Sequence, residues 1–304
     1  MTTCFGRGIR EAEIEILEMG RYTIKFLLKK CHISMANALR RVMISDVPTM
    51  AIDLIYVNEN TSVLHDEFLA HRLGLIPFKS ECIDDYEFFR QCSCKPSCHK
   101  CSIEFNLREI ALDEVKDITT DHINAIKPDC VIKPTKYISD QGTEEDPILI
   151  AKLAKNQKID IQCVVRKGTG REHAKWSPVS TVKVQQVPII EISEDLNDIL
   201  DDDEKKGLVN SCPAAVYKMN NQKQTIEIED PTNCMQCQEC SIYCDSLNKK
   251  ENLLTVDEDE SNFIFNIEST GAIPPEEIVS KAITILAEKT SELAVAAGQC
   301  KDSD

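Results

Sequence analysis

The sequence predicts an α+β protein in which short β-strands are interspersed with a few amphipathic helices. Runs such as 12–17 and 22–28 alternate apolar and polar residues with a period of two, which is typical of half-buried strands. The segments 35–43 and 279–297 instead carry apolar residues at the three- and four-residue spacing of a helix. Two cysteine clusters lie between these elements and indicate metal sites.

The size and cysteine content indicate a soluble protein of a reducing compartment. The 304 residues suffice for two or three domains. The longest apolar stretches are far too short to span a membrane, and the N-terminus shows no signal peptide. Most of the fifteen cysteines fall in metal-type clusters. This distribution favours metal binding and free thiols over disulfides, and hence an intracellular protein.

The formal net charge of -16 argues against direct binding of nucleic acid. Such binding draws most of its affinity from lysines and arginines that neutralise phosphates, and the chain has no basic run. We therefore expect contact with DNA or RNA only through partners. The two acidic runs, 201–204 and 257–260, are expected to be solvated loops.

The N-terminal part is expected to form a strand pair, a helix, a strand and a second helix. The strand pair occupies residues 11–29 and turns near Gly20. Ser34 is expected to cap the first helix, and Pro48 ends it. A strand follows at 50–57, and a short helix from Asp66 to Leu73 is closed by Gly74.

The rest of the chain is expected to form strands followed by one long helix. The predicted strands lie at 102–107, 147–150, 159–166, 180–192 and 263–268. Gly168 and Gly170 indicate a turn, and Trp176 is expected to be buried in a core or a subunit contact. The last helix starts at the pair Pro274-Pro275, has Glu276 and Glu277 in its first turn, and is closed by Gly298. Its apolar stripe must be buried against its own N-terminal helix or against another protein.

The first cysteine cluster predicts a structural zinc site. Its ligands would be Cys92, Cys94, Cys98 and Cys101, four thiols within ten residues, as in closed tetrahedral zinc sites. The loop has little to bury, so metal binding is the plausible source of its order. His99 is a spare ligand, and reduced thiols on a mobile loop are the alternative.

The second cluster has the spacing of a bacterial iron–sulfur run. In two-cluster ferredoxins the fourth cysteine of such a run serves the other cluster. One 4Fe–4S cluster would then use Cys234, Cys237, Cys240 and the remote Cys212, which is followed by proline. Cys244, followed by aspartate, would be spare. The alternative is a remnant that holds zinc or nothing.

The sequence offers no catalytic constellation. The six histidines form no metal pair and no HExxH motif, and no acidic motif is suited to holding catalytic magnesium. We therefore expect a protein that is not an enzyme by itself.

Five blocks of sequence carry a resemblance to a known family. They are, in chain order, Asn37–Asp53 (NALRRVMISDVPTMAID), Leu69–Pro77 (LAHRLGLIP), the cysteine loop at 92–101, Arg171–Pro178 (REHAKWSP) and Asn266–Pro274 (NIESTGAIP). Together they resemble the alpha-like RNA polymerase subunits, a family that includes the third-largest subunit of eukaryotic RNA polymerase II, its archaeal counterpart and the bacterial alpha N-terminal domain. The resemblance covers roughly residues 8–300.

The resemblance implies a discontinuous architecture. Residues 8–53 and 250–300 would form an alpha-subunit-like dimerisation domain. A mixed β domain with the zinc loop at 84–104 would be inserted at 54–182. A small ferredoxin-like, cysteine-rich domain would occupy 188–249, as in the archaeal member of the family.

The resemblance also implies a function and partners. The chain would be a non-catalytic assembly subunit of nuclear RNA polymerase II and would heterodimerise with the small, alpha-like eleventh subunit. The pair would be the platform for the two large catalytic subunits, with small zinc-binding subunits as further neighbours. The zinc loop and the block at 172–176 favour the eukaryotic family member. The archaeal counterpart of this subunit and an iron–sulfur electron-transfer protein are the alternatives.

Overall fold

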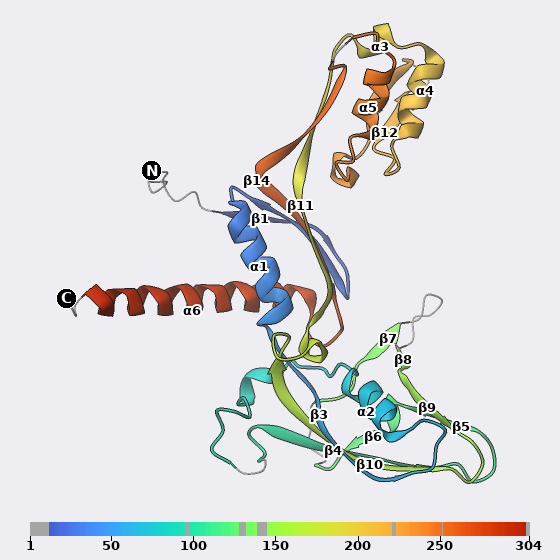
Figure 1. Ribbon diagram of the computed structural model, residues 1–304, viewed down its shortest axis with the longest axis vertical. Coiled ribbons are helices and arrows are strands. Elements are labelled where there is room, and N and C mark those ends of the chain that lie inside the picture. The colour runs from blue at the N-terminus through green and yellow to red at the C-terminus, as the bar shows by residue number, and fades with distance from the viewer. Residues whose placement is uncertain are drawn as a thin grey trace. The chain divides into compact units, whose positions relative to one another are not determined.

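The computed structural model describes residues 12–94, 98–127, 132–138, 145–220, 223–250 and 252–301 and has the mixed α+β content that the sequence predicts (Figure 1). The strands are β1 (Glu13–Met19), β2 (Thr23–Lys29), β3 (Pro48–Asn60), β4 (Ser102–Ile110), β5 (Lys116–Thr119), β6 (Ile123–Ala125), β7 (Lys136–Ile138), β8 (Glu145–Pro147), β9 (Leu149–Leu153), β10 (Lys158–Thr169), β11 (Val179–Ile192), β12 (Tyr217–Asn220), β13 (Thr225–Ile228) and β14 (Leu254–Ser269). The α-helices are α1 (Ile33–Ser45), α2 (Asp66–Gly74), α3 (Leu196–Ile199), α4 (Asp202–Ser211), α5 (Glu239–Ser246) and α6 (Pro275–Lys301), and the 3-10 helices are η1 (Ile83–Asp85), η2 (Thr120–His122), η3 (Ala174–Trp176) and η4 (Pro231–Asn233). Each predicted strand overlaps an observed one, with shifted ends, except that the strand predicted at 147–150 spans the break between β8 and β9.

The described chain divides into two compact units. One comprises residues 12–17, 25–36 and 184–265, and the other comprises 18–24, 37–183 and 266–301. Strands β11 and β14 each run from one unit into the other. None of the described helices is long and apolar enough to cross a membrane. The division into a dimerisation domain, an inserted domain and a cysteine-rich domain stays a prediction.

The larger unit is built on the antiparallel sheet β3-β10-β4-β6. Strand β10 lies between β3 and β4, so that Val165 faces Ile52 on one side and Ile103 on the other. These three side chains are buried in one apolar core, to which Phe78 and Phe105 add a tilted ring pair 5.4 Å apart. Burial of this apolar surface is the main force that holds the unit together. Trp176 is also buried, as predicted, and its indole N–H donates to the carbonyl of Arg166 over 3.1 Å.

A second sheet has the order β1-β2-β14-β11 and contains the predicted N-terminal strand pair. The turn between β1 and β2 is closed by the amide of Gly20, which donates to the carbonyl of Thr23 over 2.8 Å. In the smaller unit, the rings of Phe26 on β2 and Phe265 on β14 stack at 4.8 Å with their planes 5° apart. The alternating burial along β2 follows from the period of two in its sequence.

Both acidic runs differ from the prediction, since neither is a loop. Residues 201–204 form the start of α4, where Asp201 and Glu204 make a reciprocal capping box. Acidic side chains stabilise a helix N-terminus because they pair with its free amides and its dipole. Residues 257–260 lie in strand β14, whose backbone is paired within the sheet.

The two helices expected at a subunit contact are present, with altered ends. His32, and not Ser34, caps α1, since its ring Nδ1 accepts from the Ser34 amide over 3.2 Å. Helix α6 continues through Gly298 to Lys301, so Gly298 does not end it. Glycine inside an exposed helix costs only about 1 kcal/mol, which the rest of a long helix offsets. Lys289 on α6 pairs with Asp46 beyond the end of α1 over 2.9 Å.

The predicted turn at 168–170 lies partly within β10, which ends at Thr169. Both of its glycines are needed for close approach. A Cβ on Gly168 would collide with the Trp176 ring, and one on Gly170 would collide with the carbonyl oxygen of Ile44. Because glycine has no Cβ, the backbone at the end of β10 can lie close to the Trp176 ring and to the Ile44 carbonyl.

We expect Gly170→Ala to lower the free energy of unfolding by about 1–3 kcal/mol, because a backbone carbonyl cannot move aside as a side chain can. Gly298→Ala is the matched control, since a Cβ there meets nothing within 4 Å. The control should raise stability by up to about 1 kcal/mol. Urea unfolding midpoints of the two variants measure the difference, and equal midpoints would contradict the close approach at Gly170.

Candidate metal centres

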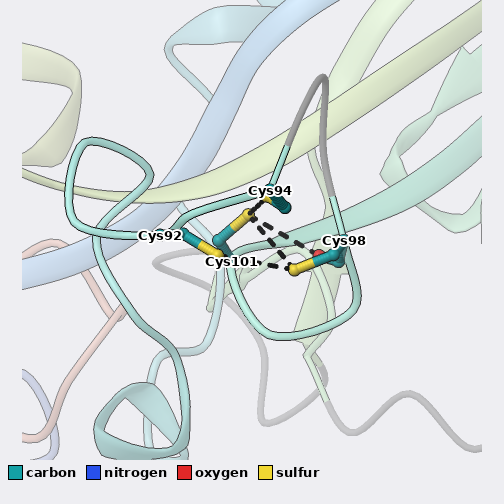
Figure 2. Close-up of side chains that lie close together, drawn as sticks. All are labelled: Cys92, Cys94, Cys98 and Cys101. Atoms are coloured by element: carbon teal, nitrogen blue, oxygen red, sulfur yellow. Dashed lines mark hydrogen bonds between the residues drawn. The ribbon is translucent and has the colours of Figure 1, made fainter.

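The first cysteine set gathers into one compact cluster between η1 and β4. The Sγ atoms of Cys92, Cys94, Cys98 and Cys101 all lie within 4.8 Å of one another (Figure 2). The separations are 3.6 Å between Cys92 and Cys98, 3.4 Å between Cys94 and Cys101, and 3.8 Å between Cys98 and Cys101. Four sulfurs at about 2.3 Å from one zinc ion form a tetrahedron with edges of about 3.8 Å. The set therefore has the dimensions of a site for a single tetrahedral metal ion.

The backbone favours the ionised form of one thiol in this set, that of Cys98, whereas hydrogen bonds with neighbouring thiols raise the pKa of Cys94. The amide of Cys101 donates to the carbonyl of Cys98 over 3.1 Å, which closes a tight turn between these two ligands. In that turn the backbone amide of Lys100 lowers the pKa of the Cys98 thiol to about 7. Metal binding requires thiolates, so a thiol that ionises near neutral pH assists it. His99 is exposed and does not join the cluster, which leaves four sulfur ligands.

Two cation–aromatic contacts hold the base of this loop against β10. The guanidinium carbon of Arg166 lies 3.8 Å from the ring centre of Phe89, and the ammonium of Lys167 lies 5.0 Å from that of Phe88. Arg166 is buried and pairs with Asp53 over 3.1 Å. The same residues line a cavity of about 590 Å³. No local sequence pattern predicts these contacts. The one available signal is the pair of adjacent phenylalanines, Phe88 and Phe89, just before the cysteine loop.

The second cysteine set lies in the smaller unit and is less tightly gathered. Cys212 follows the last residue of α4, Cys234 follows η4, Cys237 is exposed, and Cys240 and Cys244 lie on α5. Within the described residues, only the first set gathers three or more possible ligand atoms closely enough to hold one metal ion. Burial raises the pKa of Cys234, with smaller contributions from the nearby thiols of Cys240, Cys212 and Cys237.

The donor set of these four cysteines has the chemistry of an iron–sulfur site, because thiolates are the usual ligands of such clusters. A 4Fe–4S cluster binds each thiolate through a different iron, so its ligands stand farther apart than those of one zinc ion. Backbone amides already point at two of the sulfurs: Val216 donates to Cys212 over 3.5 Å, and Gln236 donates to Cys234 over 3.4 Å. Burial raises the pKa of the Cys244 thiol to about 11, with smaller contributions from Cys240 and Asp245. Cys244 is thus a buried thiol beside the set.

Comparison with known proteins gives the same family along nearly the whole chain. Residues 25–290 match the RNA polymerase Rpb3/Rpb11 dimerisation domain. The chain is 40% identical over 287 residues to the DNA-directed RNA polymerase II subunit rpb3 of Dictyostelium discoideum, which covers 93% of this chain and 94% of that relative. It is 38% identical to subunit 3 of DNA-directed RNA polymerases II, IV and V of Arabidopsis thaliana, over 92% of this chain and 89% of that relative.

An archaeal relative is similar over the same span. The DNA-directed RNA polymerase subunit Rpo3 of Archaeoglobus fulgidus is 33% identical to the chain, over 92% of this chain and 96% of that relative. The resemblance carried by the five sequence blocks is thereby confirmed. The chain belongs to the family of the RNA polymerase Rpb3/Rpb11 dimerisation domain.

Proposed function

We propose that the chain is a non-catalytic assembly subunit of nuclear RNA polymerase II. The observation that carries the proposal is the family match over residues 25–290, together with 40% identity to an RNA polymerase II subunit over almost its full length. The role is geometric: the subunit would hold other subunits in register and carry out no chemistry of its own. The lack of a catalytic constellation in the sequence agrees with such a role.

The partner of the proposed heterodimer is the small, alpha-like eleventh subunit. Helix α6 supports this, because only its first turns are buried by the chain itself, at Ile278, Val279 and Ala282. Further along the same face, Leu293 is 70% exposed. Apolar residues that repeat along one exposed helix are typical of a helix that packs against another protein.

The assembled pair would form the platform for the two large catalytic subunits and contact the small zinc-binding subunits. The net charge of -16 supports contact with DNA through those partners. The proposed dimerisation domain combines residues 8–53 and 250–300, the inserted domain spans 54–182, and the cysteine-rich domain spans 188–249.

The two cysteine sets are proposed to hold different metals. Zinc on Cys92, Cys94, Cys98 and Cys101 would order the loop of the inserted domain, and the sulfur separations near 3.8 Å support it. A 4Fe–4S cluster on Cys212, Cys234, Cys237 and Cys240 would staple the cysteine-rich domain. When bound, such a cluster can also accept and donate single electrons. The exposure of Cys237 is the one observation that favours an electron-transfer role as the alternative.

Co-expression with the small alpha-like subunit tests the proposed assembly. We expect a soluble complex of one copy of each chain that survives gel filtration, since the exposed half of α6 would be covered. A chain that is soluble and monomeric alone and shows no affinity for the small subunit would overturn the proposal.

A further inference from the structure

Tyr217 places a buried hydroxyl against a cysteine sulfur. Its side chain lies on β12 and is 3% exposed. The hydroxyl donates to Sγ of Cys240 over 3.2 Å, and this is its one hydrogen bond among the described residues. A buried hydroxyl needs a good acceptor, yet a neutral thiol is a weak one. A thiolate that carries negative charge as a metal ligand is a far better acceptor. The contact therefore makes most sense with a metal-bound Cys240.

Strained backbone brings two further donors to the same set. Ala215 and Gln236 adopt left-handed conformations, with φ of 50° and 58°. Residues with a Cβ rarely do so, and such strain gathers at functional sites. In each case the strained position lies at or next to a donor: Val216 N–H points at Cys212, and Gln236 N–H points at Cys234.

These donors reach three of the four proposed ligands. Cys212, Cys234 and Cys240 each accept one hydrogen bond at sulfur. Cys244 is buried on the same helix as Cys240, yet no donor reaches its sulfur within the described part of the chain. Donors thus reach three of the four thiols proposed to carry charge, whereas no donor reaches the sulfur of the exposed Cys237 within the described part of the chain.

We propose that Tyr217 is a tuning residue for an iron–sulfur centre on this set, raising its reduction potential through the hydrogen bond to Cys240. The inference rests on the proposed 4Fe–4S cofactor. A hydrogen bond to a ligand sulfur withdraws electron density and so favours the reduced cluster. On reduction the bound cluster would take up one electron from an external one-electron donor, such as dithionite in the test below. No bond to Cys240 breaks, and Tyr217 keeps its proton.

The test compares two tyrosine variants of the full chain, purified anaerobically with its partner subunit. Tyr217→Phe removes the hydroxyl that points at sulfur. Tyr243→Phe is the matched control, since the Tyr243 hydroxyl donates to the carbonyl of Glu204 over 3.3 Å in the same domain. Each sample is analysed for iron and sulfide and titrated with dithionite under electron paramagnetic resonance. Resonance Raman spectra in H2O and D2O then report hydrogen bonds to the ligand sulfurs.

We expect Tyr217→Phe to keep its iron and sulfide, to have a more negative potential than the native chain, and to lose part of the deuterium shift of its iron–sulfur stretches. Tyr243→Phe should match the native chain in all three. A loaded Tyr217→Phe with native potential and native deuterium shift would overturn the tuning role while leaving the cofactor in place. A native chain that contains no iron or sulfide would overturn the cofactor and the tuning role together.

Discussion

Cys101→Ser is expected to strip the first cysteine set of its metal and to release the loop that follows Phe88. Cys101 is completely buried, and its sulfur lies close to those of both Cys94 and Cys98. Its loss would leave three sulfur ligands for the metal ion. Changes to groups that merely support a ligand already cost 10- to 100-fold in affinity, so removal of a ligand should cost more than about 100-fold. Zinc per chain after gel filtration, and the rate of proteolysis within 88–101, measure the effect.

Cys82→Ser provides the control for this experiment. Cys82 is half-buried, lies just before η1 and belongs to neither cysteine set. This variant should keep its zinc and resist proteolysis like the native chain. A Cys101→Ser chain that still holds one equivalent of zinc would refute the tetrahedral site.

Leu293→Asp is expected to weaken binding of the small alpha-like subunit about 30-fold or more. Leu293 continues the apolar stripe of α6 past the part that the chain buries by itself. A charge at the centre of a helix interface leaves an unpaired ion in an apolar contact. Central interface residues commonly contribute about 2 kcal/mol or more, which corresponds to a roughly 30-fold weaker complex. Fluorescence anisotropy with the labelled small subunit gives the dissociation constants.

Ser291→Asp adds the same charge to the same helix without touching the stripe. Ser291 is two residues from Leu293, which places it about 160° away around the helix. We expect its dissociation constant to stay within a factor of about two of the native value. If both substitutions raised the dissociation constant equally, the added negative charge on α6 would explain the weaker binding, and the apolar face would not be the binding surface.

Local patterns are sufficient to predict every strand of the two main sheets except β6, the ends of helices α1, α2 and α6 to within a few residues, and the gathering of the first cysteine set. Period-two and helical spacing predict these elements because each depends on neighbours along the chain. The cap on α1 escapes prediction because a histidine ring nitrogen takes the place that serine usually fills. The start of α4 escapes it because its capping box lies inside an acidic run that also suits a solvated loop.

Contacts between distant residues lie beyond such patterns. The cation–aromatic contact between Arg166 and Phe89 joins positions 77 residues apart in the sequence. The bond from Tyr217 to Cys240 spans 23 residues. Neither residue pair stands out by spacing, because only the fold brings its members together. The spacing of the cysteines is the exception, since a metal fixes the chain geometry between its ligands.

With the proposed partner, the exposed C-terminal half of α6 would make the stability of this subunit depend on how much of that partner is present. A partner that binds only the folded chain adds stability by mass action, about 2.7 kcal/mol when present at one hundred times its dissociation constant. Copies made in excess forgo that gain and present bare leucine and valine at 293 and 295 to the cell's chaperones and proteases. Chains without a partner would then be degraded. The number of assembled pairs would be set by the less abundant of the two subunits.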